Sequence, residues 1–240
     1  MELLARAKGQ TCFRSASRFY SSHSLYHIRS KNSLLVTIMA QAKQPIQLPP
    51  LPQPIGQFSA TIARGTETIV LKEKVLSLSG DSFDIKTISG QPLFKVQGRH
   101  ATISGRKSVY DMAGNHLFDL CKEHFHLHAT YVAETPDKHK FLEIKSSIKL
   151  FGSKATATFT APDGQTHVFA MRGDWLDSQA EIVLGADKQG PVVGLIDRKF
   201  FNKREFFGGQ QTYAVTIAPG MDMALAVALC IALDEKNNEK

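Results

Sequence analysis

The strongest constraint on this chain is an apolar stretch near its C-terminus. Its eleven residues, from Met223 to Leu233, include no polar side chain, and Asp234 follows directly. Asp222, just before the stretch, is a residue type that caps helix N-termini. A helix without a polar stripe must be surrounded by apolar groups on every side. The stretch therefore predicts a helix over 222–234 that is enclosed.

A bilayer and a protein core are the two environments that can enclose such a helix. A bilayer requires about 20 apolar residues, whereas eleven residues at about 1.5 Å each reach only about 16 Å. We therefore expect a protein core. The helix is also thin, which suits the inside of a wide barrel, because alanine occupies four of its positions: Ala224, Ala226, Ala228 and Ala232.

Turn signals recur at a spacing near 25 residues between positions 90 and 190. The glycines of four of them are separated by 24, 50 and 26 residues, and they are Gly90, Gly114, Gly164 and Gly190. The midpoint of the long gap falls at another turn-type cluster around Asp137. A period of this size indicates a repeated supersecondary unit, here a β-hairpin.

The segments between these turns alternate apolar and polar residues, as half-buried strands do. The pattern is clear over 82–87, 154–160 and 211–218, and a further strand is expected over 68–78. Five hairpins and two flanking strands make about twelve strands. We predict a mainly β fold, a closed twelve-stranded antiparallel barrel over 58–236 that encloses the C-terminal helix, with a tail at 237–240.

Residues 1–40 form a leader with a composition of its own. It holds six lysines and arginines and one acid, so it carries most of the net charge of +7. An Arg- and Ser-rich, acid-poor leader is typical of a mitochondrial presequence. The alternative is translation from Met39, with a cytoplasmic protein as the result. Because the remaining chain is nearly neutral, its charge does not favour a nucleic-acid partner.

Residues 41–57 form a proline-rich arm with five prolines. Such a segment is extended and of polyproline type. It is interpreted as a linker or as a docking segment for a protein partner.

Several segments resemble the LURP-one-related family, which is similar in fold to the tubby C-terminal domain and the phospholipid scramblases. They are 71–83, 111–115, 128–131 and the strand at 211–213 with the helix after it. The resemblance covers about residues 55–238. It implies a twelve-stranded barrel around a central hydrophobic helix, and it implies no agreed biochemical activity. Tubby-like relatives bind phosphoinositides and scramblases act at membranes.

Candidate catalytic and metal-binding residues are few. His124, His126 and His128 share one face of an expected strand, but no cysteine or carboxylate is placed with them as a further ligand. Cys121 lies near these histidines in sequence, which is weak support for a thiol–imidazole pair. The motifs of common nucleotide, zinc and hydrolase sites are missing from the sequence. We therefore predict no enzyme, no cofactor and no metal site, and a monomer.

The segment 198–209 mixes four bases with four phenylalanines. At a barrel rim it would suit an anionic membrane surface, since bases attract anionic lipid and aromatic side chains insert at the interface. The alternative is that the phenylalanines close the barrel end and the charges pair locally. We predict a non-catalytic module that binds anionic phospholipid, or a protein partner, with possible lipid contacts at Arg198, Lys199, Lys203 and Arg204.

Overall fold

The computed structural model describes residues 46–74, 82–98, 105–123, 130–147, 154–174, 179–186, 189–198 and 212–238. The chain divides into two compact units, Met1–Pro45 and Ile46–Lys240. The first unit, which includes the predicted leader, lies outside the described residues. Because the second unit begins at Ile46, it contains residues 46–57 of the predicted proline-rich arm together with the barrel.

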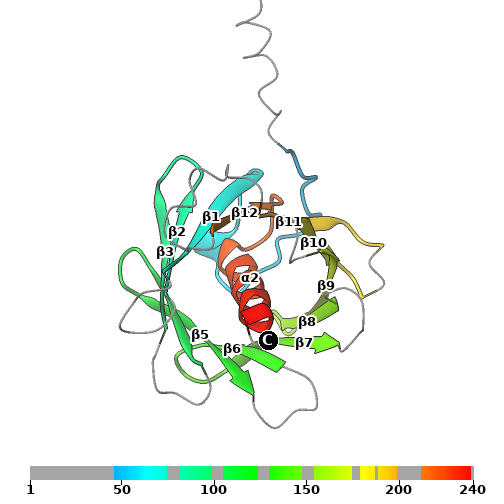
Figure 1. Cartoon of the computed structure of the whole chain (residues 1–240). Helices are drawn as coiled ribbons and strands as arrows, with labels where there is room; N and C mark the ends of the chain where they lie inside the picture. Colours follow the sequence, from blue (N-terminus) through cyan, green and yellow to red (C-terminus); the bar gives the residue numbers. More distant parts are fainter. Residues whose placement is uncertain are drawn as a thin grey trace, which may run out of the picture. The chain divides into compact units, whose positions relative to one another are not determined.

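The prediction of a closed twelve-stranded antiparallel barrel around one C-terminal helix is confirmed (Figure 1). Each strand pairs with its sequence neighbours, and β1 also pairs with β12, which closes the barrel. The strands are β1 (Glu67–Lys74), β2 (Ser82–Thr87), β3 (Pro92–Gly98), β4 (Lys107–Asp111), β5 (His116–Glu123), β6 (Thr130–Glu134), β7 (Lys140–Ser147), β8 (Lys154–Thr160), β9 (Thr166–Asp174), β10 (Gln179–Leu184), β11 (Val192–Asp197) and β12 (Thr212–Ile217).

The barrel has two distinct ends. The short helix η1 (Ser59–Thr61) and the start of helix α2 (Met223–Asn238) lie at one of them, the helix-entry end. The five predicted turns are also found there, between β2 and β3, β4 and β5, β6 and β7, β8 and β9, and β10 and β11. The opposite end, where α2 finishes, is the helix-exit end.

The turns show why their residues recur. Gly90, Gly114 and Gly164 have φ of 89°, 88° and 84°, values that favour glycine. In the turn between β6 and β7, Lys138 adopts a similar positive φ of 70°, in place of a glycine. The β10–β11 connection departs from the pattern, since Gly185 and not Gly190 has a positive φ.

Helix α2 fills the barrel. Every side chain from Ala224 to Leu233 is at most 3% exposed. Asp222 caps the helix as expected, because its Oδ1 accepts the Ala224 amide at 2.8 Å. The helix continues to Asn238, beyond the predicted end at 234. Since each buried Leu or Ile contributes about 1.5–3 kcal/mol, the wall and the helix stabilise one another.

Residues 46–58 cover the helix-entry end. The amides of Leu51 and Ile55 donate to the carbonyls of Pro219 and Gly220 at 2.9 and 2.8 Å. Both side chains are buried. The described part of the arm is therefore a component of the barrel domain, and its prolines alternate with buried anchors.

A single carboxylate, that of Asp222, joins this covering segment to the helix. Its Oδ2 accepts the amides of Gln57 and Phe58 at 3.0 Å each, and its Oδ1 accepts the Thr61 hydroxyl at 2.5 Å. Phe58 also stacks on Phe118 with ring centroids 6.1 Å apart. The cap of α2 and the closure of this barrel end thus depend on one side chain.

Candidate functional site

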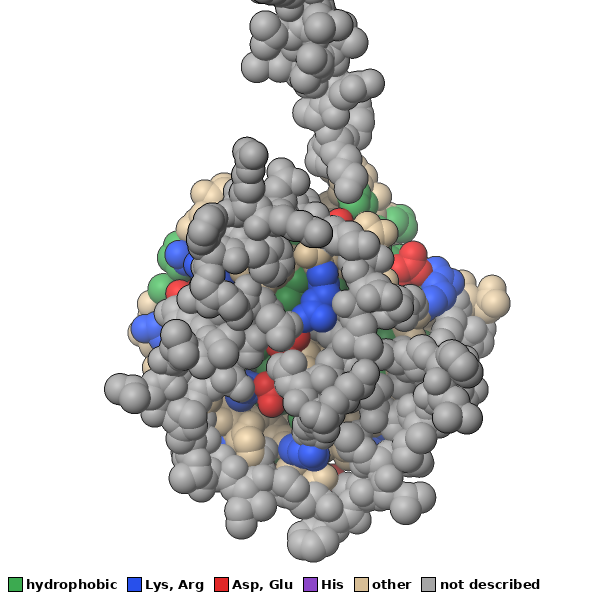
Figure 2. Space-filling model, in the orientation of Figure 1, with side chains coloured by type: hydrophobic (Ala, Val, Ile, Leu, Met, Phe, Trp, Pro, Cys, Tyr) green, Lys and Arg blue, Asp and Glu red, His purple; other side chains and the backbone are tan. Residues whose placement is uncertain are grey.

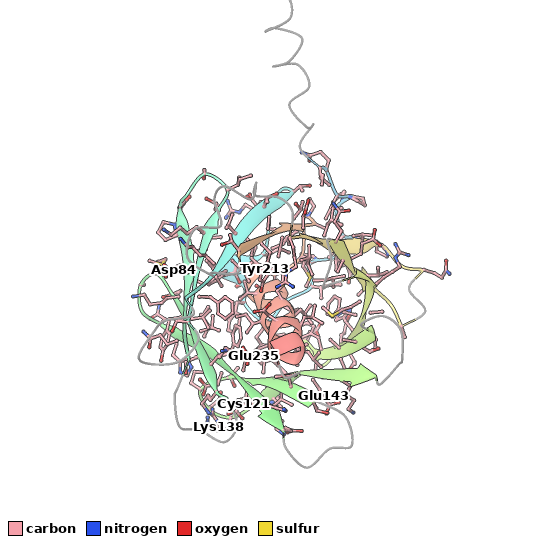
Figure 3. All side chains as sticks on the ribbon, in the orientation of Figure 1. Asp84, Cys121, Lys138, Glu143, Tyr213 and Glu235 are labelled. Atoms are coloured by element: carbon pink, nitrogen blue, oxygen red, sulfur yellow. The ribbon has the colours of Figure 1, made fainter. Side chains whose placement is uncertain are left out.

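The helix-exit end contains ionic contacts on the inner side of the wall. Arg198, which follows β11, donates from Nη2 to Oδ1 of Asp234 on α2 at 3.1 Å. Its guanidinium also lies 5.8 Å from the centre of the Tyr213 ring. The Asp234 side chain is 0% exposed and that of Arg198 19%. Arg198 therefore contacts both the helix and the ring of Tyr213, and Figure 3 labels Tyr213 beside α2.

A second pair holds the same helical turn from another strand. Lys107 of β4 lies 2.9 Å from Oε1 of Glu235 and 5.7 Å from the centre of the Phe83 ring. Cations are favourable near a helix C-terminus, where the helix dipole is negative. Figure 2 shows basic and acidic side chains together at the centre of this face. Strands β4 and β11 thus fix the last part of α2.

The four predicted lipid contacts are not equivalent. Arg198 is engaged with the helix, whereas Lys199, Lys203 and Arg204 lie outside the described residues. Strand β11 ends at Asp197 and β12 begins at Thr212, so the connection that carries these bases starts and finishes at the helix-exit end. The prediction that it contacts lipid remains a prediction.

The outer wall holds a polar network that the sequence analysis missed. Asp119 of β5 accepts hydrogen bonds from Ser108 at 2.7 Å and from Arg106 at 2.5 Å, and its Oδ1 lies 2.9 Å from His116 Nε2. Arg106 also donates to Glu134 of β6 at 2.8 Å. These groups come from neighbouring strands, so only the barrel register brings them together.

The network lowers the pKa of its carboxylates. Burial alone would raise the pKa of Asp119, but the hydrogen bonds from Ser108 and Arg106, with the charges of His116 and Arg106, lower it to about 2. Burial alone would also raise the pKa of Glu134, but the hydrogen bonds that Glu134 accepts from Lys138 and Arg106 lower it. Both groups are therefore anions at neutral pH.

The network does not have the geometry of a nucleophilic site. The Ser108 hydroxyl donates directly to Asp119, so no histidine lies between them as a base. Burial raises the pKa of the nearby Cys121 thiol to about 11. The thiol is therefore protonated near neutral pH, and the thiolate is the reactive form.

The metal hypothesis for His124, His126 and His128 falls outside the described residues. Within the described ranges, histidine, cysteine and carboxylate side chains do not gather in threes as a metal ion would need. Nor does any helix there combine the length and apolarity needed to cross a membrane.

One inward position could have been found from the sequence. Lys107 is in phase with Val109, which faces the core, so strand alternation places a lysine on the inner side of the wall. A buried lysine requires a partner. Glu235 follows the apolar helix and was available for that role.

The comparison with known families decides what kind of protein this is. The sequence profile of LURP-one-related proteins matches residues 67–234, from β1 into α2. This chain belongs to the LURP-one-related family. That family has the tubby-like fold, which agrees with the observed barrel and central helix.

Three relatives from Arabidopsis thaliana are similar over most of the barrel. Protein LURP-one-related 10 is 25% identical over 174 residues, which cover 69% of this chain and 88% of the relative. Protein LURP-one-related 15 is 21% identical, with 71% and 80% covered. Protein LURP1 is also 21% identical, with 70% and 82% covered. None of the three is named for a catalytic activity.

A solved structure of a protein from Arabidopsis thaliana is also similar. It is 16% identical to this LURP-one-related chain, with a TM-score of 0.49. The match covers 77% of this chain and 99% of that one.

Proposed function

We propose that this LURP-one-related protein is a non-catalytic binding module that recognises anionic phospholipid through the connection between β11 and β12. The proposal is carried by the composition of that connection, which combines Lys199, Lys203 and Arg204 with four phenylalanines in the sequence between β11 and β12. Each base near an anionic membrane surface contributes about 1 kcal/mol. Three bases with interfacial aromatic side chains would therefore support salt-sensitive binding.

Arg198 has a different role in this proposal. Its guanidinium is engaged with Asp234, so it is an anchor for the connection and not a lipid contact. The anchor places the start of the connection beside the end of α2. The lipid contacts proposed are accordingly the three bases that follow it.

The chemistry of the outer network supports the non-catalytic part of the proposal. Asp119 and Glu134 are held as anions by Arg106 and Lys138, and these charges satisfy one another. Cys121 beside them is a protonated thiol. Such groups stabilise a wall and do not supply a general base or a nucleophile.

Liposome flotation tests the proposal directly. The full chain is mixed with neutral phosphatidylcholine vesicles and with vesicles that contain phosphatidylserine or phosphoinositide, at low and at physiological salt. We expect flotation with the anionic vesicles only, and weaker flotation as salt rises, because ionic attraction is screened. The triple variant K199Q/K203Q/R204Q should not float.

A matched control distinguishes the loss of the proposed lipid contacts from a general loss of positive charge. The variant K72Q/K86Q/K145Q removes the same number of charges from exposed positions on other strands, and it should float like the native chain. Absence of flotation at low salt, or equal loss in both triple variants, would reject the lipid proposal.

A protein-interaction scaffold is the second candidate, favoured by one observation. A hollow of about 440 Å³ lies beside the arm, between exposed Pro52 and Pro54 on one side and the β8–β9 turn on the other. Deletion of the arm would also remove the Leu51 and Ile55 anchors. A sharper test is a pull-down with P52A/P54A, which should lose partners while the fold is kept.

A further inference from the structure

A second hollow lies on the outer face of β3 and β4, near the helix-entry end. Its volume is about 320 Å³. Its wall combines one cation, one carboxylate, one amide and one phenol with a turn, and the lining residues are Lys95, Gln97, Tyr110, Asp111, Met112 and Gly114. Volumes near 300 Å³ are at the lower limit of ligand sites, so the hollow suits one or two side chains of a partner.

The polar groups of this hollow differ in whether they already have hydrogen-bond or ionic partners. Asp111 already accepts hydrogen bonds from the amide and the side chain of Asn115, at 2.8 and 2.7 Å. Asp84, opposite Lys95 on β2, interacts with other groups. Within the part of the chain that the structure describes, the side chains of Lys95 and Gln97 have no hydrogen-bond or ionic partner. Both are exposed on the strand face.

Tyr110, between these groups and the outer network, is held in place. It pairs with Lys95 on β3 and with His116 on β5. Its ring stacks on the His116 ring with centroids 5.0 Å apart, and His116 Nε2 lies 2.9 Å from Asp119. Asp119 is itself fixed by Ser108. The phenol is thus supported by a chain of contacts, as binding groups need to be.

Exposed apolar side chains lie in two turns at this end of the barrel. Met112, in the β4–β5 turn, is 52% exposed, and Ile88, after β2, is 57% exposed. They are two of the three exposed large apolar residues in the described ranges. Strands β3 and β4, which pair with each other, lie between their two turns. Methionine and tyrosine are enriched in protein interfaces, which combine an apolar centre with polar groups.

We propose that this outer face is a docking surface for a polypeptide segment that presents one carboxylate flanked by apolar side chains. The carboxylate pairs with Lys95 and accepts hydrogen bonds from Gln97 and the Tyr110 hydroxyl. The apolar neighbours pack on Met112. A single lysine matches the single charge of a carboxylate, whereas a phosphate group carries about −1.5 to −2.

Nuclear magnetic resonance titration tests this surface with two probes. These are the acetylated, amidated tripeptides Leu-Glu-Leu and Leu-Gln-Leu, added to the full chain labelled at methionine methyl groups and at nitrogen. We expect the glutamyl peptide to move the Met112 methyl and Gln97 side-chain signals, and the glutaminyl peptide to move them much less. The variant M112L assigns the methyl signal.

Charge reversal supplies the decisive comparison. K95E should weaken the glutamyl peptide about fivefold or more, which corresponds to an exposed ion pair of about 1 kcal/mol. K145E makes the same charge change on β7 and should leave the affinity unchanged. Lys95 is exposed, so K95E is expected to fold.

Three results would overturn the assignment: equal responses to the two peptides, equal affinities of K95E and the native chain, or a response to inorganic phosphate but not to the glutamyl peptide. The surface lies near the helix-entry end, whereas β11 ends and β12 begins at the helix-exit end, on either side of the connection proposed to bind lipid. The peptide and the liposome experiments can therefore fail independently.

Discussion

Arg198 and Asp234 meet inside the barrel although they belong to different elements. The guanidinium of Arg198, just after β11, donates to the fully buried carboxylate of Asp234 on α2 at 3.1 Å. A buried charge is tolerated only when it is paired. The contact therefore fixes the end of the helix to the wall, at the base of the connection that we propose to bind lipid.

Removal of Arg198 should destabilise the fold strongly. R198A leaves the Asp234 carboxylate buried without its guanidinium, and we expect a loss of about 3–5 kcal/mol in the free energy of unfolding. Urea titration followed by circular dichroism measures the loss. K145A, which removes an exposed ion pair with Glu143, should change stability by about 1 kcal/mol or less. If R198A lost only about 1 kcal/mol, as expected for K145A, the Arg198–Asp234 pair would not be structural.

The Asp222 carboxylate should control whether residues 46–58 stay attached. D222A leaves the amides of Gln57 and Phe58 without their acceptor, and each unsatisfied buried donor costs about 1–3 kcal/mol. We expect faster hydrogen exchange at these two amides and faster proteolysis within 46–58. Unchanged exchange in D222A would contradict the proposed attachment.

Gly56 provides a second test of the same contact. A Cβ at this position would lie 2.2 Å from the Asp222 Cβ, which is closer than atoms can approach. G56A should therefore displace the covering segment and lower the melting temperature. Gly65 has no heavy atom within 4 Å of an added Cβ, so G65A is the matched control and should leave the covering segment in place.

The Asp119 network should make the fold sensitive to acid. The pKa of Asp119 is lowered from 3.8 to about 2 in the folded chain, so the unfolded chain takes up the proton first as the pH falls. Its stabilisation, about 2 kcal/mol, is present above pH 4 and is lost between about pH 4 and pH 2. Unfolding titrations from pH 6 to 2 should show this loss in the native chain and less of it in D119N. E143Q serves as the exposed control, and an identical pH profile for D119N would refute the prediction.

Cys121 should react slowly while the barrel is folded. Burial raises its pKa to about 11 and leaves its side chain 7% exposed, and alkylation requires the thiolate. We expect little labelling by iodoacetamide at pH 8 in the native chain, and full labelling in guanidinium. Peptide mass spectrometry measures both. Rapid native labelling of Cys121 would reveal a thiol activated in a way that this environment does not explain.

Much of the architecture could be predicted because it follows from local periodicity. The apolar run from Met223 to Leu233 indicated an enclosed helix, and the regular turns indicated the hairpins around it. Strands 82–87 and 154–160 have the predicted bounds. Such features are written in consecutive residues, so they require no knowledge of the register between strands.

The contacts of the site could not be predicted in the same way. Arg198 and Asp234 are 36 positions apart, and Arg106 reaches Glu134 only because β4, β5 and β6 are neighbours. The closure by Leu51 was missed for another reason, because the prolines around it favoured an extended linker. Side-chain partners of this kind depend on tertiary packing, which sequence patterns do not specify.

The position of α2 at the C-terminus has a consequence for biosynthesis. The strands leave the ribosome before the residues that fill their interior, and β1 must wait for β12 before the wall can close. Nascent chains of this protein therefore expose apolar strand faces until β12 and α2 have been made, which makes them clients for chaperones. A stop codon before Met223 would remove α2 and leave a chain that resembles this unfinished state and is directed to degradation.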